Sequence, residues 1–385
     1  MTHNSRDSYA ILLSSQLQSG LYMQGPTPRP WIDTLGIYQG GKSKIAGIDR
    51  AIKLSSNESA LGPSPKAMAA YREEATQLHR YPDPIYHDLR AALAQKYDLD
   101  PGRIVCGLGS DEILKNLCRA YAAPSDEVIY SRYGFMMYPI AAQAVGAVPV
   151  EADDDNFVAH VDSLLAAVTD KTRIVFLANP NNPTGTYLSA QELDRLHAGL
   201  PTNVILVIDS AYAEYVNFDD YDAGLELVAK APNVVMTRTF SKLYGLGSLR
   251  IGWGYAQSEI AAVLDKIRDP FNVSGPAQKA AIAALQDHEF EEKALAHNSY
   301  WRRWLSDELT ALGLTVIPSA ANFVLVRFAD TTISAEQANN YLMQKGYILR
   351  WLPGQGLADC LRMTVGLQEE NEAVIGHLKE LMQGA

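Results

Sequence analysis

One short stretch of the chain, residues 237–254, combines an amine with groups that bind a phosphate. Its sequence is TRTFSKLYGLGSLRIGWG, in which Lys242 follows Thr239 and Ser241, and Arg250 follows two glycines. Hydroxyls and backbone N–H groups can hold a phosphate, and Arg250 can neutralise its charge. The amine of Lys242 can attack an aldehyde. A lone lysine is usually an exposed surface residue, but these neighbours favour a site for pyridoxal phosphate, which carries both groups.

Polar residues that follow other apolar runs could complete such a site. Asp209 ends the run NVILVID. It could be a turn residue, or it could pair with the cofactor's pyridine nitrogen and favour the protonated, electron-withdrawing ring. Tyr212 and Asn182 could donate hydrogen bonds to the ring's 3-oxygen, although Asn182 lies in NPNNPTG, whose residue types are also those of an ordinary turn.

The segment GLGSDE places Gly109, Ser110 and Asp111 at the expected start of a helix, where free N–H groups favour a phosphate. Glu112 occupies the position at which a dinucleotide fingerprint requires its last glycine. A Walker-type GxxxxGK[ST] is also absent, and both observations argue against nicotinamide and ATP enzymes. Tyr133 could stack on a planar ring or be a core aromatic.

Two arginines near the C-terminus, Arg350 and Arg362, lie in otherwise apolar sequence. Either one alone could form a structural salt bridge. Together they suit a dianionic group better than a single carboxylate. The eight His residues show no spacing typical of metal ligands, so no metal site is expected.

The elements that must position these residues alternate between apolar runs and helical patterns. This predicts an α/β fold, with a large domain whose mostly parallel sheet is flanked by helices, plus a smaller α+β domain. Ligands of such sheets bind at the carboxyl ends of strands. The expected division is an N-terminal arm with part of the small domain (1–64), a large cofactor-binding domain (65–275) and a C-terminal small domain (276–385).

Composition restricts the partners. The 385 residues are 47% hydrophobic and carry a formal net charge of -11 without a Lys/Arg run, which argues against nucleic acid and acidic membranes. No uncharged stretch reaches the roughly 18–20 apolar residues of a spanning helix. Three cysteines at unrelated spacings and no readable signal peptide predict a cytoplasmic protein.

The lysine stretch resembles the Schiff-base segment of fold-type I pyridoxal-phosphate aminotransferases, whose fold is aspartate-aminotransferase-like. NPNNPTG, HRYPDP and NFVLVRF…ILR…LRMTVG are similar to the histidinol-phosphate aminotransferase branch, and the likeness runs from about residue 28 to the C-terminus. The resemblance implies transamination between histidinol phosphate and 2-oxoglutarate in histidine biosynthesis. It also implies a homodimer with shared active sites.

The resemblance also implies a role for each candidate residue. Lys242 would hold the cofactor and move protons, Asp209 would bind the pyridine nitrogen, and Tyr212 and Asn182 would bind the 3-oxygen. The phosphate ligands would be Gly109, Ser110, Asp111, Thr239, Ser241 and Arg250, with Tyr81 reaching the phosphate in the neighbouring subunit. Tyr133 would stack on the ring. The substrate would be bound by Arg362, Arg350, Tyr38 and Asn182.

Departures from the family's pattern leave the substrate open, including the bulky Trp351 and Leu352 after Arg350. Ser131-Arg132 replaces a usual Pro-Thr, Ser210 replaces a Glu, and Ser59-Ala60 replaces the usual residues after Asn-Glu. An aromatic amino-acid (Tyr/Phe) aminotransferase is the nearest alternative. A decarboxylase or lyase of the same fold is another. A non-catalytic regulatory protein would carry an added DNA-binding domain, for which this acidic chain has no room.

Overall fold

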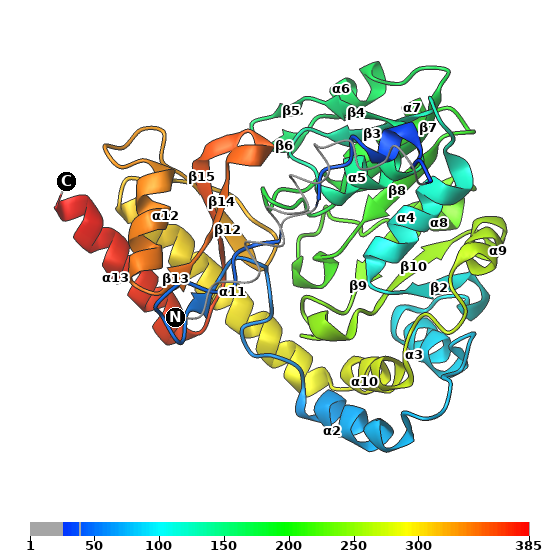
Figure 1. The fold of residues 1–385 in the computed structure, drawn as a ribbon, viewed down its shortest axis with the longest axis horizontal. Coiled ribbons are helices and arrows are strands. Elements are labelled where there is room, and N and C mark those ends of the chain that lie inside the picture. The colour runs from blue at the N-terminus through cyan, green and yellow to red at the C-terminus, as the bar shows by residue number, and fades with distance from the viewer. Residues whose placement is uncertain (1–25, 38–39, 385) are drawn as a thin grey trace.

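A computed structural model describes residues 26–37 and 40–384 (Figure 1). Its large sheet has seven strands in the order β2-β10-β9-β8-β7-β3-β4. In that order they are β2 (Ile104–Gly107), β10 (Gly252–Ala256), β9 (Val234–Thr239), β8 (Ile205–Asp209), β7 (Thr172–Ala178), β3 (Glu127–Ser131) and β4 (Val148–Ala152). Strand β10 runs in the direction opposite to the other six strands of this sheet. The expected α/β fold with a mostly parallel sheet is confirmed.

Both faces of the large sheet are buried, which explains the continuous apolar runs. Along β7, Ile174 and Phe176 pack into one core, while Val175 and Leu177 pack into the other. Helices cover the first face: α4 (Ser110–Tyr121), α5 (Met137–Ala144) and α9 (Ser258–Ile267). Helices on the second face are α2 (Pro65–Glu74), α3 (His87–Tyr97), α6 (Val161–Ala166), α7 (Ala190–Gly199), α8 (Leu225–Lys230) and α10 (Gly275–Leu285).

Helix starts follow local capping chemistry. The Ser64 side chain accepts from Ala67 N ahead of Pro65 at the start of α2, and the Ser189 side chain accepts from Glu192 N at the start of α7. Short 3-10 turns complete the connections: η1 (Pro30–Ile32), η2 (Ala75–Gln77), η3 (Pro101–Arg103), η4 (Ala213–Tyr215), η5 (Gly247–Leu249) and η6 (Pro353–Gln355). A small hairpin joins β5 (Asp154–Asp155) to β6 (Val158–Ala159).

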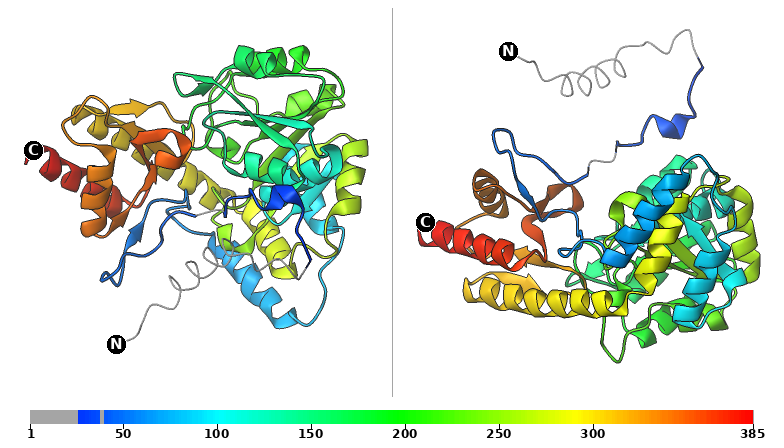
Figure 2. Two further views of the ribbon diagram at one scale, coloured as in Figure 1. Left: turned by 45° about the horizontal axis from the view of Figure 1, so that its top comes forward. Right: turned by 90° about the horizontal axis from the view of Figure 1, so that it is seen from below.

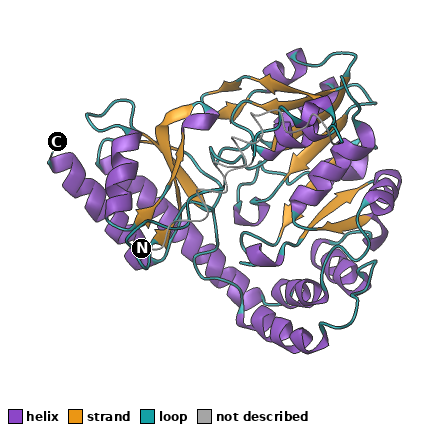
Figure 3. Ribbon diagram, viewed as in Figure 1, coloured by secondary structure: helices purple, strands orange, loops and turns teal. Residues whose placement is uncertain are grey.

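A second, antiparallel sheet has the order β11-β12-β15-β14 (Figure 3). Its strands are β11 (Thr315–Ile317), β12 (Phe323–Arg327), β15 (Leu357–Thr364) and β14 (Arg350–Leu352). One face packs on the helices α11 (His288–Ala311), α12 (Ala335–Gln344) and α13 (Gln368–Gln383). Along β15, Leu361 and Met363 point to those helices, so Arg362 and Thr364 point to the opposite face. That opposite face contacts Tyr133 and Phe157, which come from the large-sheet side.

We propose a domain boundary inside α11. Helix α10 packs on α2 and α3 and shares their core, so it lies with the large sheet although the expected small domain began at residue 276. The 24-residue α11 then extends to the second sheet (Figure 2). The pairing of β1 (Ile52–Lys53) with β13 (Tyr347–Ile348) supports assigning part of residues 1–64 to the small domain. No helix in the described ranges is long and apolar enough to cross a membrane.

Candidate active site

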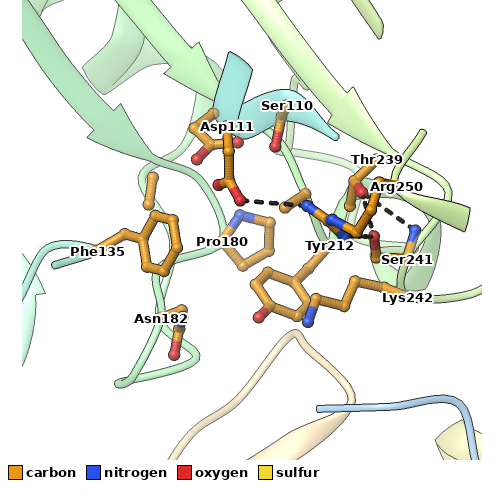
Figure 4. A pocket seen from close by; sticks show the side chains of 13 residues that line it. Ser110, Asp111, Phe135, Pro180, Asn182, Tyr212, Thr239, Ser241, Lys242 and Arg250 are labelled. Carbon is orange, nitrogen blue, oxygen red and sulfur yellow. Dashed lines mark hydrogen bonds and ion pairs between the residues drawn. The ribbon is translucent and has the colours of Figure 1, made fainter. Parts of the chain in front are cut away.

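A pocket of about 600 Å³ lies where β7, β8 and β9 end and α4 begins (Figure 4). This is the carboxyl end of the parallel strands, where ligands of such sheets bind. Its walls come from six separate segments of the chain. The lining residues are Ser110, Asp111, Phe135, Ala178, Pro180, Asn182, Asp209, Ala211, Tyr212, Thr239, Ser241, Lys242 and Arg250.

Two glycines shape the end of the pocket near α4. Gly109 precedes the helix with φ +73, and a Cβ there would lie 2.5 Å from Arg250 Nη2. A Cβ on Gly252 would lie 2.4 Å from the backbone nitrogen of Ser110. Because neither residue has a Cβ, the first turn of α4 can lie close to Arg250 and β10. The N–H groups of that first turn lack intrahelical partners. The arrangement is a backbone cradle for an anion.

Side chains complete this cradle. Thr239 Oγ1 donates to Ser241 Oγ at 2.9 Å and accepts from Ser241 N at 3.1 Å. Arg250 pairs through Nη2 with Asp111 Oδ2 at 3.3 Å and donates through Nη1 to Gly247 O at 2.9 Å. A carboxylate would repel a phosphate, so the Asp111 side chain serves by orienting Arg250. The hydroxyls, the helix start and the guanidinium supply the attraction.

Asp209 lies in the wall of the same pocket, 4% exposed. Its Oδ2 accepts from Tyr138 Oη at 2.9 Å, and its Oδ1 accepts from Thr237 Oγ1 at 3.0 Å. Burial raises the pKa of Asp209 to about 6, and the two hydrogen bonds offset part of that rise. The ionised form of a carboxylate held in this way is stabilised by a cationic partner in the pocket.

Lys242 and Tyr212 stand side by side in the pocket. Lys242 Nζ lies 5.6 Å from the Tyr212 ring centroid and donates to Ser56 O at 3.3 Å. Burial, with a contribution from the nearby charge of Arg362, lowers the pKa of Lys242 to about 8. The amine is therefore neutral in a larger fraction of molecules than an exposed lysine, which suits a nucleophile. Burial raises the pKa of Tyr212 to about 12, so its phenol keeps its proton at neutral pH.

An adjoining pocket of about 620 Å³ brings the two C-terminal arginines to Lys242. Arg350 on β14 lies opposite Arg362 on β15, so both side chains leave the same face of the sheet. Arg362 donates to Asn182 Oδ1, and its Nη2 donates to Ser55 O at 2.7 Å. The remaining lining residues are Gly41, Ser55, Ser56, Asn57, Phe135, Met136, Asn182, Tyr212 and Gln355.

The structure does not bring every candidate residue to the pocket. Tyr133 stacks on Phe157 with 5.7 Å between ring centroids, and the aromatic residue in the pocket wall is Phe135, two positions later. The structure therefore places Phe135, and not Tyr133, where a side chain could stack on a bound ring. Tyr81 is 83% exposed and stacks on Phe271 at 4.6 Å, outside the pocket of its own chain. Tyr38 lies outside the described residues.

The site contains residues that the sequence-based set lacks, among them Phe135, Tyr138, Thr237 and Asn57. Thr237 carried a usable signal, because it lies two positions before Thr239 and therefore on the same side of β9. The run RYGFMMY offers three aromatic residues, and only the turn between β3 and α5 selects among them.

Comparisons with known proteins agree with this geometry. The family profile for aminotransferase class I and II matches residues 49–378. A histidinol-phosphate aminotransferase of Paramagnetospirillum magneticum is 55% identical over 361 residues, which cover 94% of this chain and 99% of that protein. One from Sphingopyxis alaskensis is 53% identical, covering 93% and 98%.

Among solved structures, the histidinol-phosphate aminotransferase of Sinorhizobium meliloti in complex with pyridoxal-5'-phosphate superposes with a TM-score of 0.86. It is 29% identical, and the match covers 94% of this chain and 99% of that one. The family profile, the long alignments and the strand-end pocket lead to one conclusion: the chain belongs to the class I and II aminotransferases.

Proposed function

We propose that this aminotransferase uses pyridoxal phosphate to exchange an amino group between histidinol phosphate and 2-oxoglutarate, as a step of histidine biosynthesis. The observation that carries the substrate assignment is the position of Arg350 opposite Arg362, beside Lys242. A donor with a phosphate ester and an acceptor with two carboxylates must use the same place in turn. Two guanidinium groups can bind both a dianion and a monoanion there.

The chemistry of the pocket fits the cofactor. The cradle made by Gly109, Ser110, Thr239, Ser241 and Arg250 suits its phosphate, and Phe135 offers an apolar face to its ring. Bound there, pyridoxal phosphate would supply an electron-withdrawing ring that stabilises negative charge on the substrate carbon that bears the amino group.

The chain's own residues would then bind, orient and move protons. The amine of Lys242 would hold the cofactor and, once displaced by the donor, would take up and return the proton of the substrate α-carbon. Asp209 would keep a proton on the ring nitrogen, because a buried carboxylate stabilises a cation beside it. Tyr212 and Asn182 would donate to the 3-oxygen, and Arg362 would hold the carboxylate of 2-oxoglutarate or, in the donor, the phosphate that takes its place.

A homodimer with shared active sites accounts for Tyr81, an exposed aromatic outside its own pocket. In this arrangement Tyr81 would reach the phosphate in the second subunit. Mixing Lys242→Ala subunits with Tyr81→Ala subunits is expected to restore activity, because each hybrid dimer has one intact site. Failure to recover activity would contradict the shared site. We also propose a cytoplasmic location, supported by three buried, unpaired cysteines.

The substrate is tested by comparing kcat/KM for histidinol phosphate, tyrosine and phenylalanine, with 2-oxoglutarate as acceptor. Histidinol phosphate should give the highest value, and a higher value for either amino acid would overturn the assignment. The second candidate is an aromatic amino-acid aminotransferase. It is favoured by a further cavity beside Arg350, whose wall includes the apolar side chains of Met136, Ile140, Leu349 and Trp351.

A further inference from the structure

A three-residue segment, residues 55–57, touches the site at three consecutive positions. Each residue contacts a different side chain that the proposed function uses. The contacts are Ser55 O with Arg362 Nη2 at 2.7 Å, Ser56 O with Lys242 Nζ at 3.3 Å, and Asn57 Nδ2 with Tyr212 Oη at 2.8 Å. The first two use backbone carbonyls, which any residue could supply. Only the third depends on the identity of a side chain.

The position of Asn57 is fixed by the small domain. Its backbone N–H donates to Thr364 Oγ1 at 3.0 Å, and its backbone carbonyl accepts from Asn322 Nδ2 at 3.1 Å. Its φ of +55 is in the left-handed region, which Asn tolerates better than most residues. The side chain is buried, at 1% exposure. Asn57 is therefore held on several sides before it meets Tyr212.

The same contacts settle which way the amide faces. Thr364 Oγ1 accepts from the Asn57 backbone and donates to Asn57 Oδ1 at 3.3 Å. Because the amide oxygen faces Thr364, the amide nitrogen faces Tyr212 and acts as the donor. The phenol oxygen of Tyr212 thus accepts a hydrogen bond from Asn57. Its own proton remains available for a bond into the pocket, and its pKa of about 12 keeps that proton in place at neutral pH.

We propose that Asn57 is a positioning residue that holds Tyr212 as a hydrogen-bond donor to the cofactor's 3-oxygen and ties this donor to β15. This inference rests on the proposed cofactor and on the proposed role of Tyr212. Thr364, which anchors Asn57, lies two residues after Arg362 on the same face of β15. Strand β15 therefore carries Arg362 and, through Thr364 and Asn57, also holds Tyr212.

The variant Asn57→Asp tests the direction of the hydrogen bond. Asp also tolerates a left-handed backbone, but its carboxylate accepts where the amide donated, so the phenol would turn its proton towards residue 57. Loss of a donor to an anionic ring oxygen disfavours the deprotonated form of the bound cofactor. The titration midpoint of the cofactor's visible band should therefore rise by about one pH unit or more.

Three further variants complete the experiment. Tyr212→Phe should raise the midpoint by a similar amount, and adding the uncharged change Asn57→Gly to it should cause no further rise, because both act through one bond. Asn57→Gly keeps the left-handed backbone and removes the amide, and it should raise the midpoint by less. The control is Asn233→Asp, the same change at a buried Asn next to the opposite end of β9, which should leave the midpoint unchanged.

The outcomes separate the inference from the function on which it rests. If Tyr212→Phe raises the midpoint and both Asn57 variants leave it unchanged, the role of Asn57 is wrong and the proposed function stands. A full additional rise in the double variant would also contradict a role through Tyr212. An unchanged midpoint in Tyr212→Phe would refute the role of Tyr212 and the inference with it. Melting temperatures and cofactor dissociation constants of every variant identify changes caused by misfolding.

Discussion

Replacing Asp209 by Asn should stabilise the cofactor-free protein and lower the turnover of the cofactor-bound enzyme. Burial raises the pKa of Asp209 from 3.8 in the unfolded chain to about 6 in the folded one. The folded state therefore favours the protonated form, and wild-type stability falls as pH rises through that interval. The difference of roughly two pKa units corresponds to about 3 kcal/mol of lost stability above about pH 7. An amide carries no charge and avoids this loss.

The hydrogen bonds of Asp209 should survive the change. The Asn oxygen can accept from Tyr138, and the Thr237 hydroxyl can accept from the new amide nitrogen. Urea unfolding of cofactor-free protein should show no difference between wild type and variant at about pH 3–4. At about pH 8 the free energy of unfolding should be about 3 kcal/mol higher for Asp209→Asn. The control is Asp170→Asn, which changes an exposed carboxylate and should produce neither effect.

Bound cofactor should stabilise the wild type more than Asp209→Asn. A protonated ring nitrogen gives the buried carboxylate its missing partner, so cofactor should raise the melting temperature of wild type more than that of Asp209→Asn. Turnover of the variant should fall on the order of 10²–10³-fold. An equal or lower stability of cofactor-free Asp209→Asn at about pH 8 would refute the claim that this carboxylate is held at an energetic cost.

Other parts of the site and its support give separate predictions. Arg350→Ala should lower kcat/KM for histidinol phosphate on the order of 10²-fold and for tyrosine far less. Arg362→Ala should lower kcat/KM for both substrates. Equal losses for the two substrates in Arg350→Ala would contradict the two-arginine site. Gly252→Ala should weaken cofactor affinity, measured by equilibrium dialysis, because its Cβ would collide with the start of α4; unchanged affinity would contradict the cradle. Arg238→Met should cost about 3 kcal/mol in urea unfolding, because it strands the buried Glu214 carboxylate, which lies 3.4 Å away. Adding Glu214→Leu should recover most of that loss, and an undiminished loss would show that the pair is not the cause.

The fold and the centre of the site follow from local patterns in the sequence. The runs that end at Asp209 and near Lys242 are buried on both faces, which makes them recognisable as parallel strands. Strand ends then gather Asp209, Lys242 and Asn182 at one edge of the sheet. Strand β9 ends at Thr239, before it reaches Lys242. Thr239 and Ser241 form local hydrogen bonds with each other at this point. Such bonds compete with the backbone hydrogen bonds that would continue the strand.

The errors concern contacts between distant segments. Tyr133 and Phe135 are equivalent in a sequence pattern, and only the packing of Tyr133 on Phe157 and the small sheet separates them. Asn57 reaches Tyr212 across 155 positions of the chain. Asn57 is distinguished by its left-handed backbone conformation, which the spacing of apolar residues in the sequence does not reveal. Long-range hydrogen bonds of this kind depend on the docking of the two sheets.

The most direct test of the central claim is a single turnover in two halves, using purified holoenzyme. Histidinol phosphate without an oxo acid should abolish the cofactor's visible band and leave one amino group per site on the enzyme. Adding 2-oxoglutarate should restore the band and release one equivalent of glutamate. Lys242→Ala should do neither, while Lys230→Ala, which changes an exposed lysine, should behave as wild type. Glutamate release by Lys242→Ala at the wild-type rate, or no response of wild type to histidinol phosphate, would contradict the account.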